Sequence, residues 1–494
     1  MTIRFPNQEH NQGFDAPGRA EAEVFDLEVE GQIPSELDGT FFRVAPDPQW
    51  PPSLREEIFF DGDGMVGAFR FKNGHVDFIS RYVRTDKFVA ERKARRALFG
   101  AYRNPFTDDP SVAGMIRSTG NTNVIVHHGV LMALKEDSPP VAMRPDTLET
   151  IGNYRFGGKM TSETFTAHPK ICPDTGELIA FGYAAKGVAT TDIAYYVMDR
   201  DGNVVHETWF NAPRAAMVHD FAVTENYVVF PISSIVTDIP RLKAGKKAFA
   251  WKADAEQIYG VLPRRGDGKD IRWFTVPTNG FQGHTINAWD DGHKVYVDLP
   301  IMNDNAFWFF PEDSGRVPDR HSLRQTMTRW TFDLSSKSST PQAEAITNLV
   351  MAEFPRIDER YATKPYRYVY LGFMDPTAPY DFERCGPPPP TVFFNGLVRL
   401  DVTSGDTSKR WLCGPTSSLQ EPVFAPRSPD APEGDGYLIV LVNRLDEMRS
   451  DLVVLDTQHL EEGPIAVARL PLRLRNGIHG NWVPASAMPP HGDE

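Results

Sequence analysis

The sequence is poor in cysteine and has no long apolar run. Among its 494 residues are only three cysteines, Cys172, Cys385 and Cys413, without CxxC spacing, which argues against a disulfide framework or a thiolate metal site. Nowhere do about 18 apolar residues follow one another, so no transmembrane segment is expected. The polar segment from Met1 to Phe14 lacks the apolar core of a secretory signal, which predicts a cytoplasmic protein and leaves peripheral membrane contact open.

Basic charge is also scarce. The chain has 52 Lys and Arg against 66 Asp and Glu, and its formal net charge of −14 argues against a nucleic-acid partner. The one basic run, residues 92–96, is interpreted as an exposed helix face. A hydrophobic fraction of 41% and a charged fraction of 24% are typical of a globular protein with an extensive core.

Short segments rich in β-branched and aromatic residues dominate the chain. Clear examples are residues 40–44, 67–71, 123–126, 227–230, 294–297 and 437–442. Turn dipeptides such as Asp38-Gly39, Asn73-Gly74 and Asp201-Gly202 separate them, and the last predicts a hairpin between residues 195–199 and 204–208. So many short strands predict an all-β closed fold, best a seven-bladed β-propeller with about 70 residues per blade and a single domain, 1–494.

One segment departs from this pattern. Residues 86–103 contain many helix formers and few β-branched residues, which predicts a helix. We interpret residues 86–118 as a helical and loop insertion that caps one face of the propeller, where the entrance to an active site would lie.

Four of the thirteen histidines lie in distinctive segments: Ala-His-Pro at His168, Val-His-Asp at His219, Gly-His-Thr at His284 and Ile-His-Gly at His479. The glycines beside the last two permit close approach of the backbone to a crowded centre. The interval from His284 to His479 is three times that from His219 to His284, so a repeat could bring the imidazoles to one axis. An all-imidazole site suits Fe(II), Zn(II) or Cu(II).

Three glutamates are candidate partners of these histidines. An imidazole that binds a metal usually donates its second N–H to a carboxylate or a carbonyl. Glu136, Glu353 and Glu421 occupy apolar or proline-bounded segments and could supply those carboxylates. The alternative is that each is a solvent-exposed glutamate.

The motifs together resemble those of the carotenoid cleavage oxygenase family, and within it the stilbenoid-cleaving lignostilbene-α,β-dioxygenase branch. The resemblance covers most of the chain and rests on these segments in order: Phe41-Phe42-Arg43-Val44-Ala45-Pro46-Asp47-Pro48, Phe60-Asp61-Gly62-Asp63-Gly64-Met65, Ala167-His168-Pro169-Lys170, Val218-His219-Asp220-Phe221, Gly283-His284-Thr285, Glu353-Phe354-Pro355-Arg356-Ile357-Asp358, Glu421-Pro422-Val423-Phe424 and Gly477-Ile478-His479-Gly480-Asn481-Trp482. Asp47 stands where many relatives have Asn.

This resemblance implies a seven-bladed propeller with Fe(II) on its axis and O2-dependent cleavage of a C=C bond to two carbonyl products. It implies that the iron ligands are His168, His219, His284 and His479, and that Glu136, Glu353 and Glu421 hydrogen-bond three of those imidazoles. The long interval before His479 would then span blades that supply Glu353 and Glu421.

The resemblance to the stilbenoid-cleaving branch depends on Tyr102 and Lys135, which look similar to a Tyr and a Lys that bind a substrate 4-hydroxyl. A phenoxide pushes electron density onto the alkene, and Lys135 would stabilise it while Tyr102 positions or deprotonates the phenol. Phe60 and Phe307 are candidates for stacking on an aryl ring, and Thr122 for crowding an open iron position.

The expected substrates are O2 and a 4-hydroxystilbene, such as a lignostilbene or a resveratrol-like stilbene, and the products are two aromatic aldehydes. A homodimer is compatible with the sequence. The alternatives are an apocarotenoid oxygenase of the same fold and a catalytically silent propeller that acts as a binding scaffold.

Overall fold

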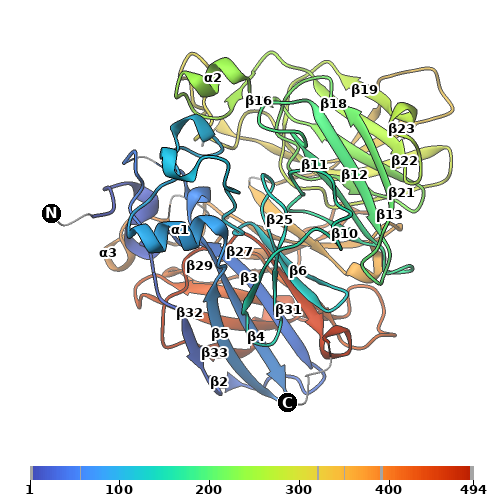
Figure 1. Ribbon diagram of the computed structural model, residues 1–494. Helices are drawn as coiled ribbons and strands as arrows, with labels where there is room; N and C mark the ends of the chain where they lie inside the picture. Colours follow the sequence, from blue (N-terminus) through green and yellow to red (C-terminus); the bar gives the residue numbers. More distant parts are fainter. Residues whose placement is uncertain (1–3, 56, 320–321, 350, 390–392, 490–494) are drawn as a thin grey trace.

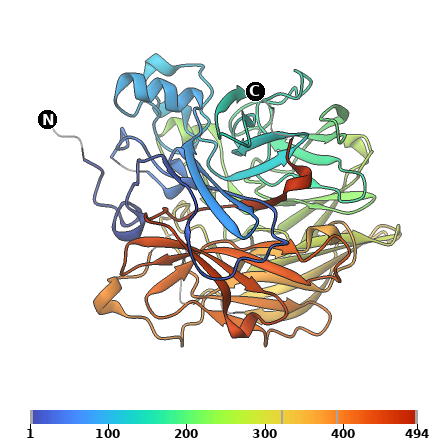
Figure 2. The same ribbon diagram turned by 90° about the horizontal axis from the view of Figure 1, so that it is seen from below.

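Seven antiparallel sheets form the body of the protein (Figures 1 and 2). The computed structural model describes residues 4–55, 57–319, 322–349, 351–389 and 393–489. In this part of the chain, seven sheets have four to six strands each, and an eighth has two. The arrangement is a seven-bladed β-propeller with few helices, which confirms the predicted fold class.

The first three blades use strands from the first half of the chain and one strand from its end. Blade one contains β1 (Ala22–Val24), β3 (Gly39–Pro46), β4 (Gly64–Lys72), β5 (His75–Tyr82) and β34 (Gly480–Pro484). Blade two contains β6 (Asn123–His127), β7 (Val130–Leu134), β8 (Val141–Met143) and β9 (Thr150–Asn153). Blade three contains β10 (Lys170–Ile171), β11 (Leu178–Tyr183), β12 (Asp192–Met198) and β13 (Val204–Asn211).

The other four blades follow in chain order. Blade four contains β14 (Ala222–Val223), β15 (Tyr227–Ile232), β18 (Gln257–Pro263) and β19 (Arg272–Val276). Blade five contains β20 (Phe281–Gln282), β21 (Asn287–Asp290), β22 (Lys294–Met302), β23 (Gln325–Asp333) and β24 (Gln342–Leu349). Blade six contains β25 (Ala352–Ile357), β26 (Tyr368–Phe373), β27 (Gly396–Asp401) and β28 (Arg410–Leu412). Blade seven contains β2 (Glu28–Gly31), β29 (Ser417–Leu419), β30 (Val423–Pro426), β31 (Gly436–Arg444), β32 (Arg449–Asp456) and β33 (Pro464–Arg469).

The two ends of the chain close the ring of blades. β34 pairs with β3, so that Phe41 lies opposite Trp482. β2 pairs with β33, so that Val29 lies opposite Ala468. Each of these two sheets thus combines strands from both ends of the chain, which protects strand edges that an open array would expose.

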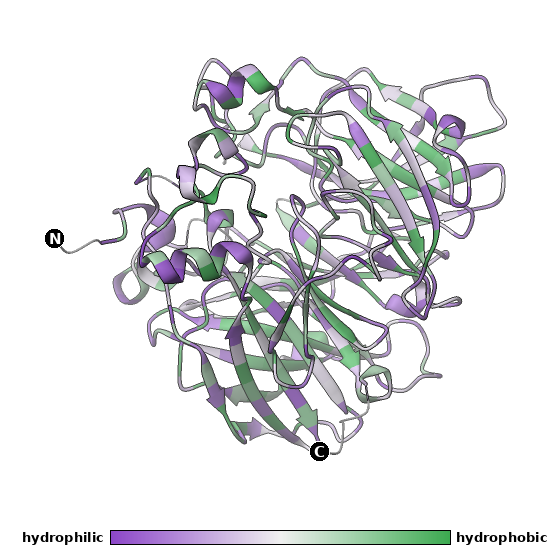
Figure 3. Cartoon of the chain, viewed as in Figure 1, coloured by the Kyte–Doolittle hydropathy of each residue, from purple (hydrophilic) through white to green (hydrophobic). Residues whose placement is uncertain are grey.

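The apolar core lies within and between the blades. Met132 of blade two packs with Leu178 of blade three, and Tyr259 of blade four packs with Val297 of blade five. Because the blades cover one another on both faces, their middle strands are buried on both sides, and all eight residues of β3 are buried. Figure 3 shows this as hydrophobic colouring along many strands and hydrophilic colouring on many connecting loops.

The predicted insertion forms a small helical cap, but its helix is shorter than expected. α1 spans Asp86–Ala94, beginning after the Thr85 hydroxyl, which accepts a hydrogen bond from Phe88 N at 3.1 Å. The prediction of a helix to residue 103 was wrong, because Arg95 adopts the left-handed conformation and the buried Glu91 carboxylate accepts hydrogen bonds from the backbone N–H groups of Leu98 and Phe99. These contacts end the helix at Ala94 and bring residues 98–99 next to Glu91.

Other short helical segments lie on the same side of the molecule as α1 (Figure 1). Two 3-10 turns, Pro105–Thr107 and Pro110–Val112, continue the insertion. α2 (Ile239–Lys243) lies between β16 (Ile235–Val236) and β17 (Ala250–Trp251), which form the two-stranded sheet, and α3 spans Phe382–Cys385. Among the described residues, no helix has the length and apolar character that spanning a membrane requires.

Candidate metal centre and adjacent pocket

Four histidines from four different blades meet at one point. His168 precedes β10, His219 precedes β14, His284 lies between β20 and β21, and His479 immediately precedes β34. Their candidate ligand atoms all lie within 4.8 Å of one another. The Nε2 atom of His219 is 3.2 Å from Nε2 of His168 and 3.2 Å from Nε2 of His284. The chain therefore presents a compact cluster of imidazole nitrogens.

Two glycines allow this close convergence, as their position beside histidines predicts. A Cβ atom at Gly283 would overlap Glu353 Oε1, and one at Gly480 would overlap the carbonyl oxygen of Phe42. A larger residue would displace the Glu353 carboxylate at the first position and the backbone of β3 at the second. The need for close approach explains why glycine flanks His284 and His479.

Three carboxylates lie behind three of the imidazoles. The Nδ1 atom of His284 is 2.7 Å from Glu353 Oε2, and that of His479 is 2.9 Å from Glu421 Oε1. Glu136 Oε1 contacts Nδ1 of His219. An ionised carboxylate can only accept, so each Nδ1–H donates and each Nε2 lone pair faces the common centre.

Each blade supplies one member of this group. In blade order from one to seven, the residues are His479, Glu136, His168, His219, His284, Glu353 and Glu421. The two blades that lie between His284 and His479 in the chain supply Glu353 and Glu421. The long interval in the sequence therefore corresponds to blades that bring carboxylates to the centre.

The electrostatics favour neutral imidazoles at His168 and His479 and an ionised carboxylate at Glu136. Burial, together with the neighbouring histidines, lowers the pKa of His168 well below its usual value, and burial lowers that of His479 to about 4. Burial alone would raise the pKa of Glu136, but the adjacent His219 and Arg103 outweigh it and lower that pKa to about 2. For His284, burial is outweighed by Glu353, which raises the pKa.

This donor set fits a divalent metal ion. Four Nε2 lone pairs that face one another without a cation repel, and Nε2 of His479 is buried with no hydrogen-bond partner in the described part of the chain. A buried polar atom without a partner is costly, and a metal ion at the centre would satisfy all four nitrogens. The three carboxylates would offset part of its charge.

Two further residues hold Glu136 in place. The Tyr183 hydroxyl donates to Glu136 Oε2 at 2.5 Å, and Arg103 Nη1 lies 3.4 Å from the same oxygen. Arg103 also donates to the Tyr183 hydroxyl. Sequence reasoning singled out neither residue, although Arg103 directly follows Tyr102, because their contacts with Glu136 span 33 and 47 residues of chain.

Phe354 packs against two of the histidines and was also missed. Its ring stacks on His284 with a centroid distance of 5.5 Å and meets His479 edge-on at 5.3 Å. Its backbone has a φ of 56°, which is uncommon for an aromatic residue, and the register of β25 shifts at this point. Strained backbone of this kind persists where the surrounding contacts over-determine it.

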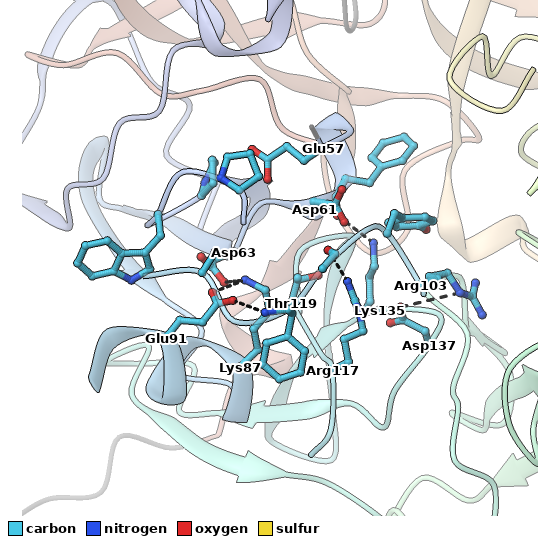
Figure 4. Close-up of a pocket in the computed structure, with 18 residues that line it drawn as sticks. Glu57, Asp61, Asp63, Lys87, Glu91, Arg103, Arg117, Thr119, Lys135 and Asp137 are labelled. Carbon is cyan, nitrogen blue, oxygen red and sulfur yellow. Dashed lines mark hydrogen bonds and ion pairs between the residues drawn. The ribbon is translucent and has the colours of Figure 1, made fainter. Parts of the chain in front are cut away.

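A pocket beside the cap brings together three residues that the sequence indicates for substrate recognition, among them Lys135, which Figure 4 labels. Phe60, Tyr102 and Lys135 all line it, with acidic and basic neighbours such as Asp61 and Arg117. The Lys135 ammonium lies 5.0 Å from the centroid of the Tyr102 ring and 5.9 Å from that of Phe60. Its Nζ donates to the Phe60 carbonyl at 3.3 Å.

Phe307 connects this pocket with the histidine cluster. Its ring centroid lies 5.9 Å from that of Phe60 and 6.3 Å from that of His219. Phe309 and Phe281 also pack against it. A series of aromatic contacts therefore runs from Lys135 and Tyr102 to the candidate metal ligands.

Lys135 lines the pocket, whereas its neighbour Glu136 contacts the histidine cluster. Adjacent residues of a strand point to opposite faces, so the local backbone has to explain how both reach the site. Strand β7 ends at Leu134, so the two side chains leave from a turn rather than from a continuing strand. Both are buried, at 4% and 5% exposure, and Glu136 reaches His219 while Lys135 reaches Phe60 and Tyr102. The charged neighbours Glu136 and Asp137 would also be compatible with a surface position of Lys135 in the sequence, and its burial excludes that alternative.

Thr122 is buried next to β6, with its hydroxyl directed to Asn121 Oδ1 at 3.1 Å. Its backbone N–H donates to the Leu134 carbonyl, which places it beside the segment of Lys135 and Glu136. In the described residues it has no hydrogen bond to any of the four histidines. Crowding of a metal position by Thr122 stays a prediction.

We expect Glu421→Gln to weaken divalent-metal binding about 10- to 100-fold, because without the carboxylate charge the Nε2 atom of His479 is a weaker metal ligand. Glu421 also accepts from Gly480 N at 2.8 Å, a contact that the amide oxygen of Gln can keep. Titration with Co(II), followed by absorbance, measures the effect. The exposed Glu344→Gln serves as the matched control, and equal affinities for the two variants would contradict the role of Glu421.

The fold and the site together define a seven-bladed β-propeller with a four-histidine centre to which all seven blades contribute. Residues 15–484 match the family described as retinal pigment epithelial membrane protein. The chain is 47% identical to lignostilbene-alpha,beta-dioxygenase isozyme III of Sphingomonas paucimobilis over 489 residues, which cover 98% of this chain and 99% of that protein. It is 48% identical to isoeugenol monooxygenase of Pseudomonas putida over 468 residues, which cover 94% and 96% of the two chains.

Among solved structures, the lignostilbene dioxygenase of Pseudomonas brassicacearum is similar over 98% of this chain and 100% of that one, with a TM-score of 0.95 and 49% identity. The protein belongs to this family, the carotenoid cleavage oxygenases, which confirms the resemblance seen in the sequence. It is accordingly an oxygenase, and oxygenative cleavage of a C=C bond is its class of reaction.

Proposed function

We propose that this protein is an Fe(II)-dependent dioxygenase that cleaves the interphenyl C=C bond of 4-hydroxystilbenes, such as lignostilbenes or resveratrol-like stilbenes, into two aromatic aldehydes. The observation that carries the proposal is the position of Lys135. Its buried ammonium lies beside Tyr102 in a pocket that aromatic rings connect to the histidine cluster.

The iron would be held by Nε2 of His168, His219, His284 and His479. When bound, it supplies the redox chemistry that lets O2 react with an alkene. The chain orients the four imidazoles through Glu136, Glu353 and Glu421, whose carboxylates hold Nδ1 as the protonated nitrogen of three of them.

Lys135 and Tyr102 would bind the substrate 4-hydroxyl in different roles. Burial lowers the pKa of Lys135, so a neutral amine is more accessible there and can accept the phenolic proton. Burial, with the nearby Glu136, raises the pKa of Tyr102 well above its usual value, so its hydroxyl stays protonated and donates to the substrate oxygen. The phenoxide then pairs with the Lys135 ammonium and pushes electron density toward the alkene.

Phe60 and Phe307 would hold the aryl ring. Phe60 contacts Phe307 and Phe309 edge-on, at 5.9 and 5.2 Å between centroids, and these rings form an apolar surface that leads from the charged pocket toward the histidines. A planar aromatic substrate packs well against such rings. Its phenol end would lie at Lys135, and its alkene would extend toward the metal.

The buried charge of Lys135 separates this proposal from the alternatives. A carotenoid offers no phenol, and its long apolar chain would add no hydrogen-bond partner to the buried amine, which donates to the Phe60 carbonyl in the structure. Two relatives are named after lignostilbene and isoeugenol, and each of these compounds has a phenol conjugated with a C=C bond. A phenolic alkene is therefore the substrate class that the pocket favours, and 4-hydroxystilbene is the member we propose.

The test compares iron-loaded protein with chelator-stripped protein, each given 4-hydroxystilbene, with isoeugenol in a parallel reaction. We expect O2 uptake and two aldehydes of the expected masses only from the iron-loaded protein, with 4-hydroxystilbene cleaved faster than isoeugenol. Cleavage of isoeugenol alone would replace the stilbene by a propenylphenol as substrate. No O2 uptake with either compound would contradict the proposal.

A further inference from the structure

A second set of polar contacts joins the backbone segments that carry the histidines. Asp220 directly follows His219 and is only 4% exposed. Its Oδ1 pairs with Lys170 Nζ at 2.8 Å, and its Oδ2 accepts from Thr285 N at 2.7 Å and from the Thr285 hydroxyl at 2.8 Å. Lys170 lies two residues after His168, and Thr285 one residue after His284, so one carboxylate links three histidine segments.

The fourth segment is tied to the first by two asparagines. Asn123 Nδ2 donates to the Ala167 carbonyl at 2.8 Å, and Asn481 Nδ2 donates to Asn123 Oδ1 at 3.1 Å. Ala167 directly precedes His168, and Asn481 lies two residues after His479. We call Lys170, Asp220, Thr285, Asn123 and Asn481 the ligand girdle. It links the segments of all four histidines through side chains other than their imidazoles.

The histidines need such support because strand pairing holds their segments weakly. β10 and β14 have only two residues each, and His168, His219 and His284 lie outside the strands. Strand β10 pairs with β11, and β14 with β15, over two residue pairs each. So few backbone hydrogen bonds would allow these segments to move. A metal centre requires its ligand atoms to be held to within fractions of an ångström.

Asp220 is the member of the girdle with the strongest contacts. A buried carboxylate is favourable only when its oxygens are paired, and both oxygens of Asp220 are engaged here. Lys170 Nζ pairs with Oδ1, and the N–H and the hydroxyl of Thr285 both donate to Oδ2, so the charge of the carboxylate is compensated on both oxygens. Charge-assisted hydrogen bonds of this kind are about twice as strong as neutral ones.

We propose that Asp220 is a positioning residue that fixes the spacing of His168, His219 and His284 and so sets the affinity and geometry of the metal centre. It acts through Lys170 and Thr285, and in the described part of the chain its carboxylate makes no hydrogen bond to the three imidazoles. The inference rests on the proposed binding of a metal by the four histidines.

The test is a Co(II) titration of metal-stripped protein, followed through the visible absorption of the bound ion and accompanied by thermal unfolding of the metal-free protein. For Asp220→Asn we expect an affinity at least about 10-fold weaker than that of the unmodified protein, together with a changed absorption spectrum. The variant Asp451→Asn is the control. Asp451 is equally buried and paired with Arg444 and Arg449 in blade seven, so its loss should lower stability but leave the Co(II) affinity unchanged.

A second pair of variants keeps the test decisive if Asp220→Asn folds poorly. Thr285→Val removes the hydroxyl donor but keeps the backbone N–H, and we expect several-fold weaker Co(II) binding; Thr285→Ser restores the hydroxyl and should restore the affinity. Unchanged affinity and spectrum in Asp220→Asn, or in Thr285→Val where Asp220→Asn does not fold, would overturn the positioning role. Failure of the unmodified protein to bind Co(II) would instead overturn the metal site itself.

Discussion

Lys135→Met lowers the turnover of 4-hydroxystilbene by at least about 100-fold while the iron content of the purified protein stays the same. Met has nearly the length of Lys and suits a buried site, but it can neither take the phenolic proton nor pair with a phenoxide. Loss of a proton-transferring side chain typically costs about 100- to 10,000-fold in rate. Steady-state O2 uptake and metal analysis of the same preparation measure the two quantities.

The control for this substitution is Lys186→Met, at a lysine whose side chain is 64% exposed and pairs with Asp192. It should leave turnover and iron content unchanged. If Lys135→Met lowered iron content and turnover in the same proportion, Lys135 would have a structural role, and the assignment of the phenol site to the pocket would be wrong.

His284→Ala removes bound iron and lowers activity to the background of the metal-stripped protein. The substitution takes away one of four converging nitrogens and leaves Glu353 without the N–H group that it accepts from. Three imidazoles would bind iron less tightly, and a buried carboxylate without its partner destabilises the site further. Metal analysis, O2 uptake and thermal unfolding together separate loss of metal from loss of fold.

His206→Ala is the matched control, because His206 lies in β13, outside the histidine cluster, and its Nε2 contacts the Gly266 carbonyl at 3.1 Å. Iron content and turnover should not change. Unchanged iron content and turnover in His284→Ala would contradict the role of His284 as a metal ligand. The alternative of a catalytically silent scaffold predicts instead that the unmodified protein has no turnover and that His284→Ala leaves its function intact.

The sequence was a good guide to the blades because their patterns are local. The continuous apolar run at residues 437–442 reflects burial of β31 on both faces, and Asp201-Gly202 lies between β12 and β13, as the hairpin prediction requires. Closure by β2 and β34 could not be predicted, since it pairs residues from opposite ends of the chain. The single domain, 1–494, stays a prediction.

Only those site residues that lie in recognisable sequence motifs could be predicted. Each histidine lies in a distinctive tripeptide and each glutamate in an apolar or proline-bounded segment, and the resemblance to the oxygenase family then implies that both sets belong to one centre. Arg103 and Tyr183 lie in no such segment, and Phe354 lies in one that indicates no role for its ring. Their importance comes from packing against residues far away in the chain, which a local pattern does not reveal.

The length of α1 illustrates the same limit. Helix propensity favours a helix through residue 103, but the buried Glu91 carboxylate binds two backbone N–H groups beyond the turn and ends the helix at Ala94. Tertiary contacts overrode the local preference. The turn that results brings Tyr102 to the pocket and Arg103 to Glu136.

The most direct test of the central claim, that Lys135 recognises a substrate phenol, compares 4-hydroxystilbene with its 4-methyl ether in the iron-loaded protein and in Lys135→Met. The ratio of kcat/KM for the two substrates is the quantity to measure. We predict that the unmodified protein prefers the phenol by at least about 100-fold and that this preference collapses to near unity in Lys135→Met. A preference that is absent in the unmodified protein, or that survives in Lys135→Met, would contradict the account.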